Sequence, residues 1–291
     1  MALELSDILK LLQEGQHGGS GKGISFWTKA AANGRQVRLE QEDKANRAAA
    51  PIIDDAGEPT DKLNALIIGT AYHLLQEHAS GDVSEHVWDA RESAFTGEFA
   101  EAVRLFRAYQ SRYGSVSARW GFTDYRTEVP LPATPEGTKL ALELYGEEVT
   151  GRLDGVGYIS MENLPRVMRE TGLALPGPGF YLLDLKTAGR ESPNDCYTYE
   201  HGLQAANYIT LWNLENPDNL CHGMIFDQIV RTKVVKFKAY FAPAFAAEPE
   251  RVKNLVKIGR HNLDNDICNP TGCKSFFAPC YWYKCGRCPG F

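Results

Sequence analysis

The second half of the chain alternates apolar, strand-like segments with segments of helical spacing, and this pattern constrains the fold more than any other feature. Five segments are predicted as strands: residues 125–131, 148–159, 180–186, 223–230 and 234–241. A Pro-Gly-Pro-Gly break interrupts the chain shortly before the third of them. Apolar strands must bury a face against other elements, so the pattern predicts a sheet covered by helices.

Helices are predicted where apolar residues recur at helical spacing: residues 61–79, 97–113, 194–212 and 249–263. The predicted order is therefore helices, three strands, a helix, two strands and a last helix. This order is typical of an α/β domain whose central strands form a meander flanked by helices.

The composition is that of a globular protein with a sizeable core. The chain has 291 residues, 43% of them hydrophobic and 23% charged, close to the usual values for folded domains. Its net charge of -6 argues against non-specific coating of nucleic acid. A nuclease is not excluded, because a metal site concentrates carboxylates and a basic groove can be local.

Membrane insertion and secretion are not expected from the sequence. No apolar run approaches the roughly 20 residues that a membrane span needs. The first residues, MALELSDILK, place acidic residues early and lack a basic region followed by an apolar core. They predict an amphipathic helix and not a signal peptide, and we expect a cytoplasmic protein.

Two predicted strands carry acidic residues between apolar neighbours. Asp154 lies in the segment GRLDGVG, and Asp184 and Lys186 lie two residues apart in YLLDLKT, so that their side chains share a face. One interpretation is a strand-end salt bridge between Asp184 and Lys186. The other is a Mg²⁺ site, since Mg²⁺ takes one or two carboxylates together with water and phosphate oxygens. Lys186 would then stabilise charge at phosphorus or help to deprotonate the attacking water.

Several short motifs resemble, in order, the RecB-like and phage-exonuclease branch of the PD-(D/E)XK nuclease superfamily. They are GTAYHLLQE at 69–77, TEVPL at 127–131, GRLD at 151–154, LDLKT at 183–187, QAANY at 204–208 and FDQIVRTK at 226–233. The resemblance covers about residues 61–241. It implies a restriction-endonuclease-like core of the α/β class, with a central mixed sheet flanked by helices.

The resemblance also implies that His73 is a metal ligand beside Asp154 and Asp184, and that Glu128 shapes the site. Taken alone, His73 is compatible with an ordinary helical histidine, and Glu128 with a half-exposed strand carboxylate. Gly69 lies one turn before His73. A mid-helix glycine costs up to about 1 kcal/mol relative to alanine, so we expect close packing of this helix on the sheet.

Gln204 and Tyr208 are one helical turn apart and share a face. The resemblance implies that they face the metal site and orient Lys186 or a DNA phosphate, whereas Tyr208 alone is equally compatible with core packing. Arg231 and Lys233 follow the fourth strand, where they would either contact DNA phosphates or remain solvated in a turn.

The C-terminal end of the chain is rich in cysteine, which indicates metal binding more than disulfide bonding in a protein with no secretory signal. The cluster consists of Cys268, Cys273, Cys280, Cys285 and Cys288. Its spacings fit a Zn²⁺ site or an iron–sulfur cluster, with free thiols as the alternative. Relatives that carry an iron–sulfur cluster use one cysteine ahead of the first helix. This chain has no cysteine before Cys196, so a cluster of that kind is not expected.

The predicted organisation is an N-terminal helical extension over residues 1–60, a nuclease core over 61–263 and a cysteine-rich tail over 264–291. The resemblance implies a deoxyribonuclease that depends on Mg²⁺ or Mn²⁺, most similar to phage-type exonucleases of recombination or repair. Its partners would be DNA, a single-strand annealing or recombination protein, and further copies of itself, in a bacterial or phage-infected cell. An endonuclease on the same core, or an inactive DNA-binding or assembly factor, are the alternatives.

Overall fold

The computed structural model describes most of the chain from the second predicted helix to the last. The described residues are 23, 27–28, 30–31, 68–73, 75–76 and 97–265. The cysteine-rich tail therefore lies outside the described residues, as does most of the N-terminal extension. Among the helices that are described, none is long and apolar enough to cross a membrane.

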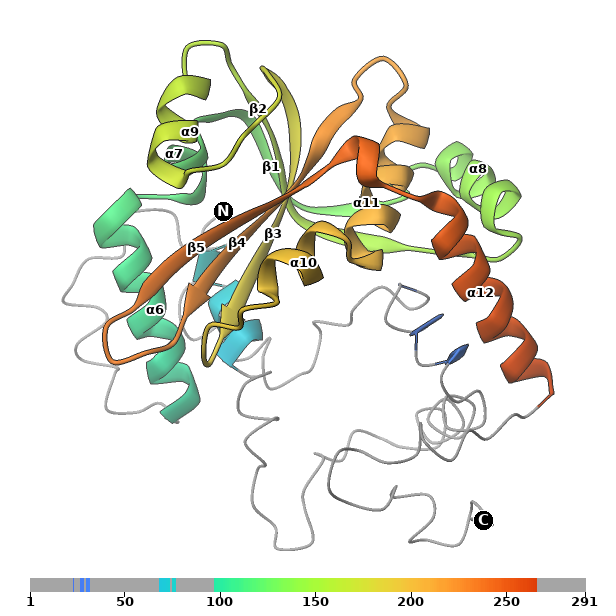
Figure 1. Ribbon diagram of the computed structural model, residues 1–291, viewed down its shortest axis with the longest axis horizontal. Helices are drawn as coiled ribbons and strands as arrows, with labels where there is room; N and C mark the ends of the chain where they lie inside the picture. Colours follow the sequence, from blue (N-terminus) through green and yellow to red (C-terminus); the bar gives the residue numbers. More distant parts are fainter. Residues whose placement is uncertain are drawn as a thin grey trace, which may run out of the picture.

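A five-stranded mixed sheet forms the centre of the molecule (Figure 1). Its strands follow the order of the chain: β1 (Phe122–Leu131), β2 (Gly151–Ile159), β3 (Gly179–Ala188), β4 (Cys221–Val230) and β5 (Lys236–Pro243). Neighbouring strands are antiparallel except β3 and β4, which are parallel. The predicted meander and the predicted α/β class with a mixed sheet are confirmed.

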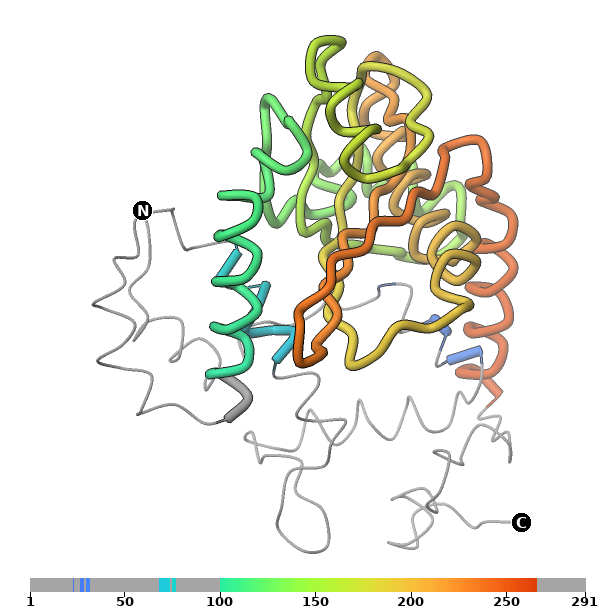
Figure 2. Tube along the Cα trace, turned by 60° about the vertical axis from the view of Figure 1, so that its left-hand side comes forward, coloured from blue at the N-terminus to red at the C-terminus, as the bar shows by residue number. Residues whose placement is uncertain are grey.

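The helices cover both faces of this sheet. They are α6 (Gly97–Tyr113), α7 (Val116–Trp120), α8 (Pro135–Tyr145), α9 (Leu164–Thr171), α10 (Asp195–Glu200), α11 (Leu203–Glu215) and α12 (Pro249–Asp264), with a short 3-10 turn η1 (Ala244–Ala246) before the last. Figure 2 shows α6 and α12 on opposite sides of the strands. The parallel pair β3–β4 is joined through α10 and α11, because parallel strands need a long crossover.

The helices depart from the sequence prediction in two ways. The helix predicted over residues 194–212 is wrong as a single element, because α10 ends at Glu200 and Gly202 is extended (φ -69°, ψ 145°) before α11 begins. Helices α7, α8 and α9 were not predicted. Local signals for α8 do exist: the Thr134 side chain accepts a hydrogen bond from Gly137 N, and Gly146 ends the helix in the left-handed region at φ 75°.

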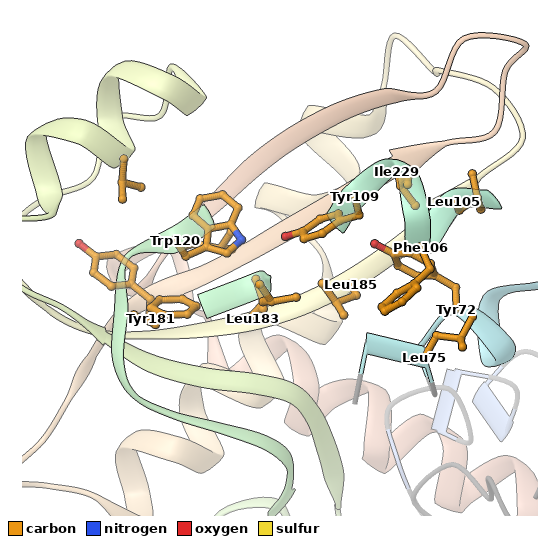
Figure 3. Packing of buried hydrophobic residues seen from close by; sticks show 14 of the residues in the cluster. Tyr72, Leu75, Leu105, Phe106, Tyr109, Trp120, Tyr181, Leu183, Leu185 and Ile229 are labelled. Atoms are coloured by element: carbon orange, nitrogen blue, oxygen red, sulfur yellow. The ribbon is translucent and has the colours of Figure 1, made fainter. Parts of the chain in front are cut away.

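Successive side chains of a strand point to opposite faces of the sheet, so the strands contribute residues to two separate cores, one on each face. One core joins the sheet to α6, α7, α9 and the helical residues 68–73 and 75, and includes Tyr72, Phe106, Trp120 and Leu183 (Figure 3). The other joins the opposite face to α8, α11 and α12. Trp27 and Ala30 belong to this second core. The described part of the predicted extension therefore contributes to the core.

A buried charged network lies within the first core. Asp227 on β4 accepts hydrogen bonds from Arg119 Nη1 at 2.5 Å, Tyr109 Oη at 2.7 Å and Trp120 Nε1 at 2.9 Å. In Figure 3 the Tyr109 hydroxyl and the Trp120 indole nitrogen point toward one another. Both members of the ion pair are buried, with side chains 4% and 1% exposed for Arg119 and Asp227. The network ties α6 and α7 to the middle of the sheet.

Removing the Asp227 carboxylate should destabilise the protein strongly. Asp227→Ala leaves Arg119 buried without its counter-ion, which typically costs about 3–5 kcal/mol. Urea unfolding monitored by tryptophan fluorescence measures the change. The matched control is Lys139→Ala, which removes an exposed pair with Glu136 and should change the free energy of unfolding by less than about 1 kcal/mol. Equal effects from the two variants would contradict a structural role for the network.

Candidate active site

The candidate site lies where β2 and β3 separate. Their antiparallel ladder runs from the pair Ile159–Gly179 to the pair Gly155–Leu183 and ends there. β3 nevertheless continues beside β4 as far as Ala188. Asp154 and Asp184 are the next residues on the two strands, so the register brings both carboxylates to the point of separation.

Asp154 is held by groups on two other elements. Its Oδ2 accepts a hydrogen bond from Leu185 N at 2.6 Å, and its Oδ1 lies 3.3 Å from His73 Nδ1. Beyond the end of the β2–β3 ladder, a backbone N–H of β3 that faces β2 has no strand partner and needs another acceptor. The Asp154 side chain therefore replaces the missing backbone acceptor, and this contact fixes its orientation.

Asp184 is buried and belongs to a small network with Lys186 and Gln204. Its Oδ1 accepts a hydrogen bond from Gln204 Nε2 at 2.7 Å, and Lys186 Nζ lies 2.5 Å from its Oδ2. Lys186 also donates to Gln204 Oε1 at 3.3 Å. Gln204 is the second residue of α11, and its amide therefore bridges the carboxylate and the ammonium. The salt bridge expected from the sequence exists, but its carboxylate is buried, unlike that of a surface pair.

Tyr208 supports this network one turn further along α11. Its hydroxyl lies near the backbone of Arg152 and the side chain of Gln204. Its ring lies against Gly151, where an added Cβ would come within 2.4 Å of ring carbon Cε1. The side chain is almost wholly buried in the second core. Tyr208 thus joins α11 to β2 just before Asp154, and it combines core packing with contact to the site.

Glu128 lies on β1, opposite Asp154 of the neighbouring strand β2. The pairs Thr127–Gly155 and Val129–Leu153 flank this position. Glu128 forms an ion pair with Arg152, and its backbone has φ 52°, in the left-handed region that residues other than glycine seldom adopt. By this register, Glu128, Asp154 and Asp184 occupy one level across three adjacent strands.

His73 reaches the site because its helix lies close to β3. A Cβ on Gly69 would lie 3.2 Å from Thr187 Oγ1, so a larger residue would push the helix away from the strand. This confirms the close packing expected of Gly69. His73 follows one turn later and faces Asp154.

Arg231 and Lys233 lie in the turn between β4 and β5, away from the carboxylates. Arg231 N donates to Ala188 O at 2.7 Å and its guanidinium lies beside Gly189, whereas Lys233 is exposed. Their role in DNA binding stays a prediction. The metal-binding role of the tail cysteines also stays a prediction, since they lie outside the described residues; of the two described cysteines, Cys196 is exposed and Cys221 buried.

Burial and mutual repulsion shape the electrostatics of the site. Burial raises the pKa of Asp184, and the neighbouring charge of Asp154 adds to the increase, against the opposing effect of Lys186. Burial alone would raise the pKa of Asp154, but His73 and Lys186 lower it. Burial lowers the pKa of His73, yet Asp154 and Asp184 outweigh this effect and raise it to about 9. Two carboxylates thus compete for the positive charges around them.

The carboxylate chemistry of the site fits a divalent cation. The Oδ2 atom of Asp184 is buried and accepts no hydrogen bond of ordinary geometry, although Lys186 Nζ is close to it. Within the described residues, no three His, Cys, Asp or Glu side chains converge as a ready-made metal cluster. Mg²⁺ needs only one or two carboxylates from a protein, so Asp154 and Asp184 are sufficient to hold it.

A small cavity, partly open to solvent, adjoins Asp154 and Glu128. The space inside it that the centre of a water-sized sphere can reach is about 10 Å³, enough for about one water molecule. The residues that line it are His73, Gln76, Tyr125, Thr127, Glu128, Asp154 and Leu185. Sequence reasoning missed Tyr125, Gln76 and the amide of Leu185. The first two carry no sequence signal that separates them from core residues, and a backbone amide leaves no signal at all.

Comparisons with known proteins leave the family open. The chain matches no protein-family model and no curated protein. Two solved structures are similar in shape. The first is a protein from Eubacterium rectale provisionally named an exonuclease, with 11% identity, 92% of this chain and 88% of that chain covered, and a TM-score of 0.48. The second, SSO0001, has 12% identity, 87% and 83% coverage and a TM-score of 0.37. Scores this low do not assign a fold family, so the function must be argued from the site.

The His73–Asp154 contact predicts a pH-dependent stability in the absence of divalent ions. The pKa of His73 is raised from 6.5 to about 9 in the folded state. Protonated His73 therefore stabilises the folded state. This contribution is complete at pH values below 6.5, the pKa of histidine in the unfolded chain, and is lost as the pH rises through about 9. Urea midpoints of wild type and His73→Gln, measured in a chelator, should differ at pH 6.5 and converge toward pH 9. The exposed His261→Gln serves as control. A difference that is constant across this range would contradict the assignment.

Proposed function

We propose that this chain is a metal-dependent deoxyribonuclease that hydrolyses phosphodiester bonds, acting as an exonuclease. One observation carries the proposal: two carboxylates, Asp154 and Asp184, meet at the separation of β2 and β3, with the ammonium of Lys186 held beside them by Gln204. Buried groups of like charge are unfavourable for stability. Their presence here, beside a lysine and a cavity, is typical of a catalytic site.

The residues of the chain would divide the work between them. Asp154, Asp184 and His73 would hold Mg²⁺ or Mn²⁺, which supplies positive charge to polarise the phosphate and to favour ionised water. Lys186 places a further positive charge next to Asp184, where it can stabilise the charge that develops on the phosphate oxygens. Gln204 orients Lys186, and Tyr208 holds Gln204.

The preference for an exonuclease rests on the motif order of the sequence, which resembles phage-type enzymes of recombination and repair. An endonuclease on the same core would use the same carboxylates and lysine. The non-enzymatic alternative, a DNA-binding or assembly factor, would have no need for a buried carboxylate pair. The intact pair therefore favours an enzyme over this alternative.

End dependence separates the two enzymatic alternatives. Purified full-length protein is incubated with Mg²⁺ and either end-labelled linear DNA or closed circular DNA of the same sequence. An exonuclease degrades the linear substrate and spares the circle, whereas an endonuclease cuts both. If neither substrate is cleaved with Mg²⁺ or Mn²⁺, the proposed activity is refuted.

Replacing either carboxylate should abolish cleavage without unfolding the protein. Asp154→Asn and Asp184→Asn keep the side-chain size but remove a charge that the cation needs, so we expect cleavage rates to fall by at least about 100-fold. Stability should change little in Asp184→Asn, because the variant loses a buried charge and also the ion pair with Lys186, two effects of opposite sign. Initial rates and thermal unfolding are measured together. The control is the exposed Asp218→Asn, which should retain wild-type values for both.

Lys186 distinguishes catalysis from a structural salt bridge. A catalytic role needs a compact ammonium beside the phosphate, and a wider guanidinium is a poor substitute. Both Lys186→Ala and Lys186→Arg should therefore lose about 100-fold or more in cleavage rate. DNA affinity measured in Ca²⁺ should persist. Lys236→Arg is the matched control, because Lys236 pairs with Glu191 at the surface. An active Lys186→Arg enzyme would assign the residue to the structural role.

A further inference from the structure

Tyr125 on β1 forms one wall of the cavity beside Asp154 and Glu128. No sequence motif marks it. Its ring packs against the first core as that of any buried aromatic residue would. The question is whether the hydroxyl has a function that this packing does not explain.

The backbone of β1 is distorted where Tyr125 turns toward the cavity. The register between β1 and β2 shifts between Thr123 and Arg126, and Asp124 has φ 50°. A bulge of this kind re-aims a side chain, and a residue other than glycine in the left-handed region is strained unless the surroundings enforce it. The distortion therefore determines the direction of the Tyr125 side chain.

The ring is fixed on both sides. Its plane stacks on Phe122, with centroids 5.6 Å apart and an interplanar angle of 14°. On the other side it covers Gly155, where a Cβ would lie 2.6 Å from ring carbon Cε2 and 2.8 Å from the hydroxyl oxygen. The hydroxyl is thus held at the level of Gly155, the residue next to Asp154. With the other described residues it forms no hydrogen bond, so it remains available to a group in the cavity.

The walls of the cavity suit water better than a phosphate. Two carboxylates, Asp154 and Glu128, line it and would repel an anion. A buried water needs two to four polar partners, and the hydroxyls of Tyr125 and Thr127 together with the amide of Gln76 can supply them. A tyrosine hydroxyl both donates and accepts, so it can orient a water molecule through either kind of hydrogen bond.

We propose that Tyr125 is a catalytic residue that contacts and orients the attacking water in this cavity. The inference rests on the proposed phosphodiester hydrolysis. In that step the water oxygen forms a bond to phosphorus as the bond from phosphorus to the leaving sugar oxygen breaks. One proton passes from the water to a carboxylate that lines the cavity, and the leaving oxygen takes a proton from solvent. Tyr125 itself neither gains nor loses a proton.

The test is Tyr125→Phe, which removes the hydroxyl and keeps the stacked ring. Because a mispositioned water slows only the chemical step, kcat should fall about 10- to 100-fold while KM remains unchanged. DNA affinity in Ca²⁺ and the thermal midpoint should match wild type. The control is Tyr158→Phe, another half-buried tyrosine of the same sheet, which packs on Phe180 at the far end of β2.

The outcomes separate this inference from the proposed function. Wild-type kcat in Tyr125→Phe would overturn the inference alone, as would a loss confined to KM or DNA affinity, which would make the hydroxyl a substrate-binding group. A fall in the thermal midpoint that accounts for the lost activity would make Tyr125 structural. A wild-type protein that cleaves no DNA would refute the proposed function itself.

Discussion

The separation of β2 from β3 beyond Gly155 and Leu183 determines where polar groups can gather in this protein. As long as two strands are paired, their backbone groups satisfy one another and little space is left between them. Once the ladder ends, the amide of Leu185 needs an acceptor, and the carboxylate of Asp154 provides it. Asp184, the next residue of β3, accepts a hydrogen bond from Gln204 of α11. The orientation of Asp154 therefore follows from this opening in an otherwise continuous sheet.

The opening can exist because the sheet is held firmly elsewhere. β3 remains paired with β4 over nine positions, from Phe180 to Ala188, so the loss of β2 as a neighbour does not free it. Behind β4, Asp227 binds groups from α6 and α7 in a buried network. Its backbone lies beside Leu185 in the parallel ladder. Asp227, which binds α6 and α7, and Leu185, whose amide orients Asp154, are therefore paired residues of one ladder.

Sequence reasoning recovered those parts of this arrangement that depend on periodicity. The strands around Asp154 and Asp184 and the helix Gly97–Tyr113 follow from apolar spacing, and the shared face of Asp184 and Lys186 follows from strand geometry alone. The break at Gly202 was missed because apolar spacing continues across it. The distorted backbone at Asp124 was missed for a different reason: positive φ values in aspartate and glutamate are imposed by tertiary contacts and have no sequence signal.

The distribution of charge at the opening shows that stability alone does not account for these contacts. Asp184 has a pKa raised by burial and by Asp154, and one of its oxygens accepts no well-formed hydrogen bond. A core optimised for stability would place apolar side chains here, since replacing buried ion pairs by well-packed apolar groups is often neutral or favourable. His73 and Lys186 reduce the repulsion without removing it, because each contacts a different carboxylate. Two carboxylates buried in this way cost the fold stability, and the paired strands around them tolerate that cost.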